Sequence, residues 1–344
     1  MIDIFITLII LIILFIICIW NSKKTTFPNT FFDPNYTNTL KGLSAIIVIL
    51  VHIPTTYQNP LQEMIGSFAF VAVTIFFMIS SYGMEFCIKN KPYYLKNFWR
   101  NRLISLLIPC ILINFIDVIY QLIQNNSFNL YKLININHYI IILLEYCLWF
   151  YIIEKISYRL KMKKNLTDIF LISGILCSSL YLYLSNDNAQ NSAQMGWCYE
   201  RCGLIWGILL YRHYQYITKW LNRSQYLKIL CFAITSICIG FLYVKFKSIY
   251  FWGEFLLKII LGFNIITFIF LLSSNRVFKN KANILLGKIS YEIYLSHGLS
   301  IVIIKNLLSN TTSGIFILST ILLTIIISNI IHPISNHLIK LLRA

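Results

Sequence analysis

Long apolar runs separated by short polar segments dominate the chain. Residues 4–20 (IFITLIILIILFIICIW) contain no charged side chain, and similar runs recur as far as the C-terminal part. A run of about 20 apolar residues is long enough to cross the hydrocarbon core of a bilayer as a helix. Helices and closed barrels are the structures that satisfy every backbone polar group there. The pattern therefore predicts an all-α, polytopic membrane helix bundle.

About eleven segments fit this description, each long enough or nearly long enough to span a bilayer. Their approximate ranges are 2–20, 40–57, 65–88, 103–123, 138–154, 166–184, 197–211, 227–244, 254–273, 289–308 and 315–335. The first segment begins MIDIF, with no positive residue before it and no small-residue cleavage site after it. We therefore expect a retained transmembrane helix there and not a signal peptide.

Composition agrees with the apolar pattern. Charged residues make up 12% of the chain, hydrophobic residues 58%, and the mean hydropathy is +0.71. A soluble domain carries about 25% charged residues, so this chain has too few to cover a water-facing surface. The nine cysteines lie almost entirely within apolar segments and form no CxxC pair. We expect them to pack as small hydrophobic side chains.

The net charge of +17 is explained by the position of the charges. Most of the 29 Lys and Arg residues fall after the first, third, fifth, seventh and ninth segments or near the C-terminus. Positive residues gather in cytoplasmic loops. The alternation predicts an N-terminus outside the cell and a C-terminus in the cytoplasm, and it requires no nucleic-acid partner. Attraction to anionic lipids or to an anionic cytosolic ligand fits the same distribution.

Lys41 and His52 stand at the two ends of one apolar run, "LKGLSAIIVILVH". Eleven residues correspond to about three turns plus 20°, so both lie on one helix face, about 16 Å apart along the axis. With Lys41 at the cytoplasmic end, His52 lies near the middle of the bilayer, where an ionisable group is a functional candidate. A neutral imidazole there can act as a general base. The alternative is a helix-capping role beside Pro54.

Two further helices carry polar residues at a similar depth. Ser80 follows the FF pair of the third segment, and His297 lies about 13 Å above Lys288 in the tenth. Tyr294 shares the helix face of His297. Together with His52, these side chains predict a buried polar chamber. The alternatives are small-residue helix packing for Ser80 and interfacial anchoring for Tyr291 and Tyr294.

Five motifs in order resemble acyltransferase family 3, the multi-pass bacterial membrane O-acyltransferases that modify surface sugars. They are the Lys41–His52 run, "FVAVTIFFMISSYG", "FWRNRLISLLIP", "RCGLIWGILLYR" and "LGKISYEIYLSH", and the resemblance covers about residues 40–335. The chain departs from the family pattern at Thr74, Ser81 and Ser105. The resemblance implies an extra N-terminal helix and cytoplasmic linker, residues 1–38, before a membrane acyltransferase domain, residues 39–344, with a ten-helix core.

The resemblance also implies an activity and a location. The expected reaction moves an acyl group, most often acetyl, from cytoplasmic acyl-CoA to a hydroxyl of a cell-surface or lipid-linked saccharide. The expected location is the cytoplasmic membrane of a bacterium, and no permanently bound cofactor or metal is expected. His52 is the expected catalytic base, and Lys41, Arg100 and Arg102 are expected to hold the CoA phosphates. The expected chamber or substrate residues are Ser80, Tyr82, Tyr291, Tyr294, His297, Glu200 and Arg201.

Alternatives remain open at this level. Glu200 and Arg201, at the outer mouth of the seventh segment, could instead form a local ion pair or an interface anchor. A transporter or flippase for a lipid-linked glycan also needs buried polar groups in a helix bundle. Transporters often contain repeats and interrupted helices, and the sequence shows no clear pair of these. A catalytically silent scaffold is a third possibility, because three motif positions depart from the pattern.

Overall fold

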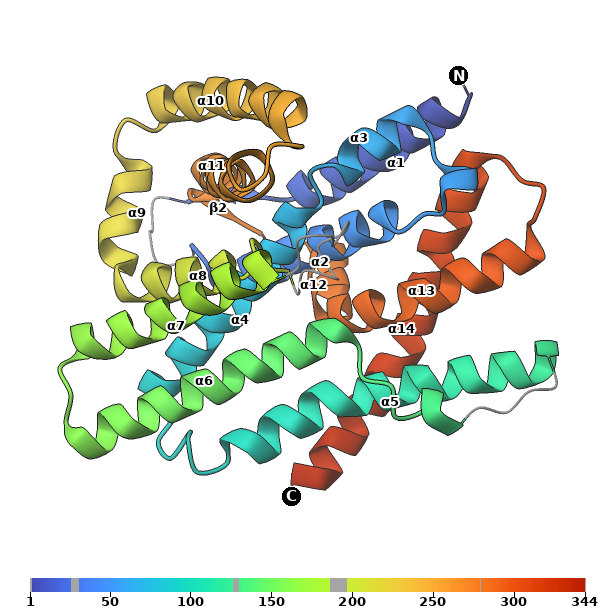
Figure 1. Cartoon of the computed structure of the whole chain (residues 1–344). Helices are drawn as coiled ribbons and strands as arrows, with labels where there is room; N and C mark the ends of the chain where they lie inside the picture. The colour runs from blue at the N-terminus through green and yellow to red at the C-terminus, as the bar shows by residue number, and fades with distance from the viewer. Residues whose placement is uncertain (1, 26–30, 126–129, 186–196, 279, 344) are drawn as a thin grey trace.

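The computed structural model describes residues 2–25, 31–125, 130–185, 197–278 and 280–343, which are almost entirely helical (Figure 1). The helices are α1 Ile2–Ile19, α2 Pro34–Val51, α3 Pro60–Gly66, α4 Phe70–Asn90, α5 Phe98–Asn125, α6 His138–Leu160, α7 Lys164–Ser185, α8 Cys202–Arg212, α9 Tyr214–Asn222, α10 Gln225–Phe246, α11 Leu257–Ser273, α12 Lys281–Lys288, α13 Ser290–Leu307 and α14 Ser313–Arg343. A π-helical turn, Trp252–Leu256, precedes α11, and short 3₁₀ turns lie at Thr55–Tyr57 and Leu130–Lys132. The two-residue strands β1 (Lys23–Lys24) and β2 (Arg276–Val277) pair antiparallel.

Each of the eleven predicted segments coincides with one long or apolar helix. Within the described ranges, six helical stretches are long and apolar enough to cross a membrane: Pro60–Asn90, Phe98–Gln124, Lys164–Ser185, Gln225–Phe246, Trp252–Ser273 and Ser313–Arg343. Two shorter apolar helices, Asp3–Ile19 and Cys202–Arg212, accompany them. The all-α class and the multi-pass membrane character follow from these helices, while the number of eleven crossings stays a prediction.

The boundaries of α2 differ from the predicted 40–57. The helix begins at Pro34, because the Asp33 carboxylate accepts a hydrogen bond from the Tyr36 amide (2.7 Å) and Pro34 occupies the first helical position. It ends at Val51, shortly before Pro54, and His52 becomes its C-terminal cap. Lys41 therefore lies about 10 Å inside the helix and not at its end.

Two of the departures from the family pattern, Thr74 and Ser81, lie where α4 packs closely against α8. A Cβ atom added at Gly203 would lie 2.2 Å from the Thr74 carbonyl oxygen, and one at Gly207 would lie 2.0 Å from the Ser81 hydroxyl oxygen. Small residues allow helix backbones to approach closely in membranes. Thr74 and Ser81 thus face α8 and do not face a substrate cavity.

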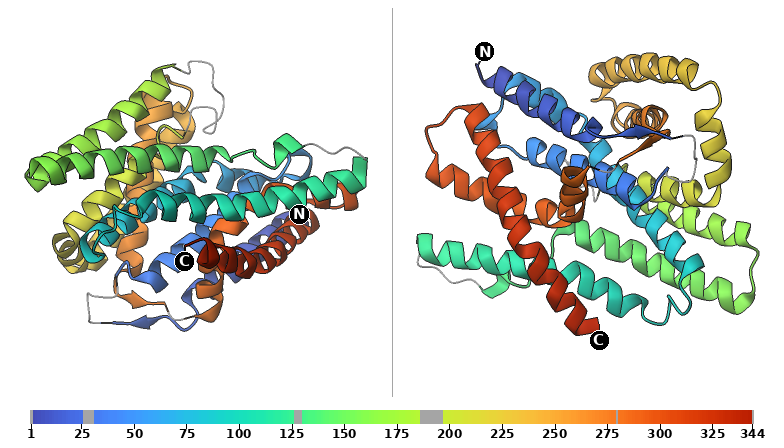
Figure 2. Two further views of the ribbon diagram at one scale, coloured as in Figure 1. Left: turned by 90° about the horizontal axis from the view of Figure 1, so that it is seen from below. Right: turned by 180° about the vertical axis from the view of Figure 1, so that it is seen from behind.

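The other helices surround the α2–α4–α8 centre, and Figure 2 shows the bundle from two more sides. Helix α1 joins the bundle through polar contacts at its first turns. The Asp3 carboxylate accepts from the Gly314 amide (3.0 Å), and the Asn59 amide donates to Thr7 (2.9 Å) and Ser313 (2.9 Å). The two chain ends lie at opposite ends of the bundle (Figure 1).

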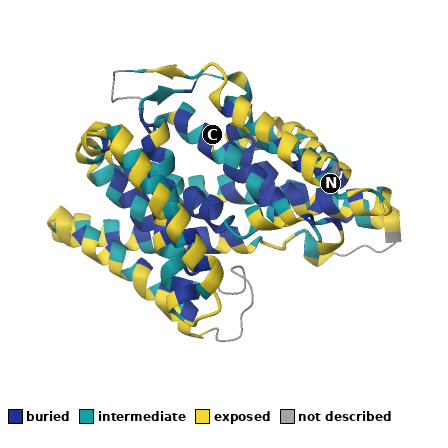
Figure 3. Cartoon of the chain, turned by 90° about the horizontal axis from the view of Figure 1, so that it is seen from above, coloured by how far each residue is buried: buried dark blue, intermediate teal, exposed yellow. Residues whose placement is uncertain are grey.

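Burial follows the pattern expected of a bundle in lipid. Buried residues line the faces where helices meet, and exposed residues cover the outer faces (Figure 3). Many exposed side chains are large and apolar, such as Phe15, Phe115 and Phe241. Helix α10 is the extreme case, since only Gly240 and Tyr243 are buried along it. These outer faces suit a hydrocarbon solvent and not water.

Candidate functional site

His52 and His297 lie side by side, although they come from α2 and α13. Their ring centroids are 4.7 Å apart. His52 Nδ1 lies 2.8 Å from the Val48 carbonyl oxygen, and His297 Nδ1 lies 2.5 Å from that of Tyr294. A carbonyl oxygen only accepts, so Nδ1 of each neutral imidazole carries the hydrogen. Nε2 of each ring is then the nitrogen with a free lone pair, which is the form a general base requires.

His52 lines a cavity of about 550 Å³ at the end of α2. We call it the His52 cavity. Its wall is formed by Val48, Val51, His52, Gly66, Ser67, Ala69, Phe70, Val73, Trp197, Tyr199, Glu200, Tyr243, Lys247, Glu254, Lys258 and Tyr294. Carboxylates, ammonium groups and aromatic rings therefore surround the imidazole. Among the described residues, no group of three or more His, Cys, Asp or Glu side chains is arranged to hold a metal ion.

Unusual backbone places Glu254 in the His52 cavity. The π-helical turn Trp252–Leu256 contains it, and Phe251 immediately before has φ of 61°. π-Helical turns are rare and frequently lie at functional sites, and a positive φ is unusual for a bulky residue such as Phe. The Glu254 carboxylate accepts from the Tyr183 hydroxyl (3.4 Å). The local backbone thus directs a carboxylate into a cavity that already holds an imidazole.

Lys258 connects the two carboxylates of the cavity. Its ammonium donates to the Tyr199 hydroxyl (2.7 Å) and lies 3.9 Å from the centroid of that ring. It also attracts both Glu200 and Glu254 electrostatically. Glu200 is 1% exposed. Opposite charges are therefore balanced on the wall, which lowers the cost of holding carboxylates at this depth.

The predicted chamber residues divide into two groups. Tyr294 and Glu200 line the His52 cavity, and His297 lies against His52. Ser80 instead donates to the Phe76 carbonyl oxygen of its own helix (2.8 Å), and Tyr291 donates to that of Leu106 (2.8 Å). These two hydroxyls serve helix packing, and neither lines the cavity.

Arg201 and Tyr82 also lie elsewhere. Arg201 is 6% exposed and forms an ion pair with Glu145 of α6 (3.0 Å), so a carboxylate from a neighbouring helix already neutralises it. Tyr82 lies near the opposite end of α2, where its ring contacts Phe32 (centroids 4.6 Å apart) and Tyr211 (5.5 Å).

Lys41 lines a second compartment at that opposite end. One cavity of about 580 Å³ contains Lys41, and a neighbouring cavity of about 630 Å³ contains Lys89 and Lys219. Tyr82, Phe86 and Tyr214 line both of them. We call the pair the Lys41 compartment. The two compartments thus lie toward opposite ends of α2, and Lys41 and His52, which line one each, are about 16 Å apart along the helix axis.

Arg100 and Arg102 lie outside both compartments. The Arg102 guanidinium donates to the Tyr94 hydroxyl (3.1 Å) and lies 5.8 Å from the Phe98 ring centroid. Arg100 donates to the Arg343 carbonyl oxygen (3.0 Å). Neither side chain lines the cavity that contains Lys41 or the cavity that contains His52.

The sequence analysis missed a buried ionic cluster around Arg212. Its guanidinium lies 2.8 Å from Glu85, 3.6 Å from Glu154 and 3.0 Å from Asp168. These four residues, here called the Arg212 cluster, join α8 to α4, α6 and α7. The available signal was the presence of Glu85 and Arg212 inside or beside apolar segments, where charges need partners.

A second missed pair lies near Lys41. The Glu292 carboxylate lies 2.8 Å from His332 Nδ1 and also attracts Lys41. His332 Nε2 is 2.9 Å from the Asn336 amide nitrogen. The Glu292 carboxylate is therefore bound to α14 and also contributes negative charge near Lys41.

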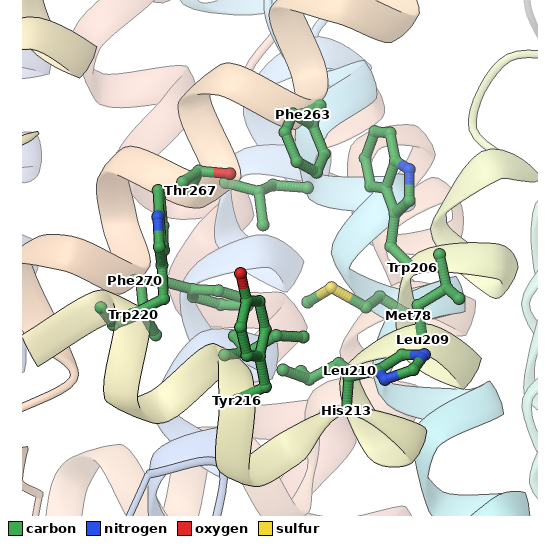
Figure 4. A pocket seen from close by; sticks show the side chains of 13 residues that line it. Met78, Trp206, Leu209, Leu210, His213, Tyr216, Trp220, Phe263, Thr267 and Phe270 are labelled. Atoms are coloured by element: carbon green, nitrogen blue, oxygen red, sulfur yellow. The ribbon is translucent and has the colours of Figure 1, made fainter.

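A third kind of cavity is almost wholly apolar (Figure 4). It encloses about 560 Å³ between α4, α8, α9 and α11, and Met78, Trp206, Trp220, Phe263 and Phe270 are among its lining residues. No Asp, Glu, Lys or Arg belongs to the lining. This cavity suits an apolar occupant and offers no acid–base chemistry beyond His213.

Comparison with known proteins agrees with the motifs. Residues 35–332 match the family model described as the acyltransferase domain, acyltransferase family 3. No curated protein and no solved structure gave a match. The matched range includes Lys41, His52, His297 and every residue that lines the His52 cavity. Because the match covers most of its length, the chain belongs to acyltransferase family 3 and is a membrane acyltransferase.

Proposed function

We propose that the protein transfers an acyl group, most often acetyl, from cytoplasmic acyl-CoA to a hydroxyl of a cell-surface or lipid-linked saccharide. The single observation that carries this proposal is the imidazole of His52 on the wall of a polar cavity, with Nδ1 hydrogen-bonded to a carbonyl oxygen. That geometry leaves Nε2 as a base where a hydroxyl can enter. The organism would be a bacterium and the location its cytoplasmic membrane, with the N-terminus outside.

The donor would enter at the Lys41 compartment. Lys41, Lys89 and Lys219 supply positive charge there, and Tyr82 and Tyr214 supply aromatic surface. Ammonium groups bind phosphates by charge-assisted hydrogen bonds. The distance from Lys41 to His52, about 16 Å along α2, suits an extended pantetheine arm that carries the thioester to the imidazole.

The acceptor would enter at the His52 cavity. Glu200 and Glu254 can accept hydrogen bonds from sugar hydroxyls, while Lys247 and Lys258 can donate to sugar oxygens. Trp197, among other aromatic residues of the wall, offers an apolar surface for a sugar ring. Such a mixture of aromatic and charged side chains is suited to a polyhydroxylated ligand and less suited to a long apolar one.

The reaction follows from these placements. His52 Nε2 removes the proton of the acceptor hydroxyl while that oxygen bonds to the thioester carbonyl carbon. The tetrahedral intermediate collapses, the carbon–sulfur bond breaks, and the thiolate of CoA takes the proton from the imidazolium. The products are an ester and free CoA. Fixing donor and acceptor on either side of one imidazole makes the attack effectively intramolecular.

Oriented membrane vesicles test the proposal. Vesicles with the cytoplasmic face outward receive labelled acetyl-CoA, and mass spectrometry of surface glycans then measures acetyl incorporation. We expect incorporation with the wild type and with His337→Ala, an exposed control, and loss with His52→Ala. Normal acylation together with failed glycan export in His52→Ala would instead support a flippase and overturn the proposal.

A further inference from the structure

The apolar cavity of Figure 4 adjoins the cavity that contains Lys89 and Lys219, because His213 and Tyr216 line both of them. The first encloses about 560 Å³ and the second about 630 Å³. Figure 4 shows His213 and Tyr216 at one end of the apolar cavity and Phe263 at the other. At that shared end, an apolar space therefore borders a polar one.

Helix α9 lies between the two cavities, and its faces differ accordingly. Ile217, Trp220 and Leu221 line the apolar cavity, whereas Gln215 and Lys219 line the polar one. Residues three or four apart share a helix face, so the sequence of α9 itself produces one apolar and one polar face. An amphipathic helix of this kind lies at the boundary between the hydrocarbon and the headgroups of a bilayer. The junction of the two cavities is therefore expected at the level of the headgroups.

The two lysines of the polar cavity form no ion pair within the part of the chain that the structure describes. The ion pairs found there involve Arg201, Arg212 and His332, and none involves Lys89 or Lys219. Arg212 also lines this cavity, but three carboxylates already compensate its charge. The lining itself contains no Asp or Glu. The two ammonium groups are therefore available to an anion, and a phosphate is the anion that membrane lipids carry.

The paired cavities suit a ligand whose anionic group lies close to an apolar chain. The long acyl chain of a CoA donor fits this arrangement poorly, because its thioester must reach His52. The apolar cavity shares no lining residue with the His52 cavity, so a chain held there would keep the thioester away from the imidazole. A phospholipid has its phosphate only a few bonds from its chains, as the shared wall at His213 and Tyr216 requires.

We propose that an anionic phospholipid binds here, with one acyl chain in the apolar cavity and its phosphate near Lys89 and Lys219. A zwitterionic headgroup is disfavoured, because its ammonium group adds positive charge beside the two lysines. If the proposed function holds, the bound lipid and the acyl-CoA donor compete for Lys89 and Lys219. That competition rests on the proposed function, whereas the lipid site itself does not.

Binding measurements on the purified full-length protein test the site. Native mass spectrometry compares the retention of phosphatidylglycerol, of phosphatidylcholine with identical chains, and of palmitoyl-CoA, each added alone. Thr267→Trp fills the apolar cavity, into which the Thr267 side chain points (Figure 4), and Ile260→Trp is its control at an exposed position of α11. Lys219→Gln removes one ammonium group, and Lys96→Gln is its exposed control outside both cavities. Thermal unfolding of each variant verifies that it is folded.

We expect the wild type to retain phosphatidylglycerol about tenfold more strongly than phosphatidylcholine, which corresponds to one charge-assisted contact. Lys219→Gln should lose most of this preference, and Thr267→Trp should weaken the retention of both lipids about tenfold. Both controls should behave as the wild type.

Equal retention of phosphatidylglycerol by Thr267→Trp and Ile260→Trp, or by Lys219→Gln and Lys96→Gln, would overturn the site. Retention of palmitoyl-CoA in place of phosphatidylglycerol, lost in Thr267→Trp, would assign the cavity to the chain of the donor and overturn the lipid. Because no acyl transfer is measured, failure of the proposed function would leave all of these results unchanged.

Discussion

The Arg212 cluster and the His52 cavity place buried charges in opposite ways. In the cluster, one guanidinium lies within 2.8–3.6 Å of three carboxylates from α4, α6 and α7. The same arginine, Arg212, also lines the cavity that contains Lys89 and Lys219. In the cavity, carboxylates and ammonium groups lie on the wall around about 550 Å³ of space that contains the His52 imidazole. The first arrangement neutralises charge within the bundle, and the second presents charge to a ligand.

This difference shows how charged residues that bind a ligand can be distinguished from charged residues that stabilise the fold of a membrane bundle. A buried ionic group is expensive wherever it lies, so its presence alone does not identify a site. What distinguishes the His52 cavity is an imidazole with a defined tautomer and the unusual backbone at Phe251 and Glu254. Substitutions in the two regions should therefore separate activity from stability.

The largest effect should come from His52→Ala. Loss of the general base is expected to lower the acyl-transfer rate by about 10²–10⁴-fold. Stability should change little, because the imidazole is exposed to the cavity and its ring hydrogen bond joins it to its own helix. The measurements are the transfer rate with labelled acetyl-CoA and the unfolding temperature of the purified protein. A folded His52→Ala variant with a normal transfer rate would show that His52 is not the general base.

Arg212→Gln should act mainly on the stability of the protein. Removing the guanidinium leaves the Glu85 carboxylate buried without its partner, at a cost of about 3–5 kcal/mol. The unfolding temperature should fall strongly, whereas Arg223→Gln, an exposed control, should have almost no effect.

A double variant provides the second half of this test. Glu85→Gln combined with Arg212→Gln removes both members of the closest pair and should recover part of the lost stability. If Arg212→Gln unfolded at the wild-type temperature, the Arg212 cluster would not stabilise the bundle.

A smaller effect is expected from Glu254→Gln in the His52 cavity. Losing one carboxylate acceptor should raise KM for the glycan acceptor about tenfold, with KM for acetyl-CoA and the unfolding temperature unchanged. Glu63→Gln on α3, which is exposed, serves as the control. Steady-state kinetics with each substrate varied in turn measures the effect. A change in the KM for acetyl-CoA alone would show that Glu254 contacts the donor and not the acceptor.

The smallest effect should come from His297→Asn. The Asn side-chain amide can still donate to the Tyr294 carbonyl oxygen, but it no longer places an imidazole against His52. We expect kcat to fall about three- to tenfold while both KM values stay constant, because a positioning contact is lost and the base is retained. A loss as large as that of His52→Ala would instead make His297 the base.

Local features of the chain were predictable because helix geometry depends on neighbouring residues. The eleven apolar segments coincide with helices, and the shared face of Lys41 and His52 follows from the helical period. The start of α2 was missed because Asp33 and Pro34 lie outside the apolar run, although both are ordinary helix-start residues.

Contacts between helices could not be predicted in the same way. Arg201 lies next to Glu200 in the sequence, yet it pairs with Glu145 of α6, while Glu200 lines the His52 cavity. Both residues lie in the turn before α8, with Arg201 as the N-cap of that helix, so the path of this turn through the bundle assigns them to different surroundings. Ser80 and Tyr82 likewise belong to the motifs but do not line the His52 cavity, because the packing of α4 directs them elsewhere.

The sequence by itself determined the membrane class, the helical segments, the family, and the presence of Lys41 and His52 on one apolar run. These properties depend on hydrophobicity and on a period of 3.6 residues, which are local. Only the tertiary structure decided that His52 meets His297, that Arg212 gathers three carboxylates, and that Arg343 reaches Ser105. Each of these contacts joins segments far apart in the chain, and helix order, rotation and packing set them together.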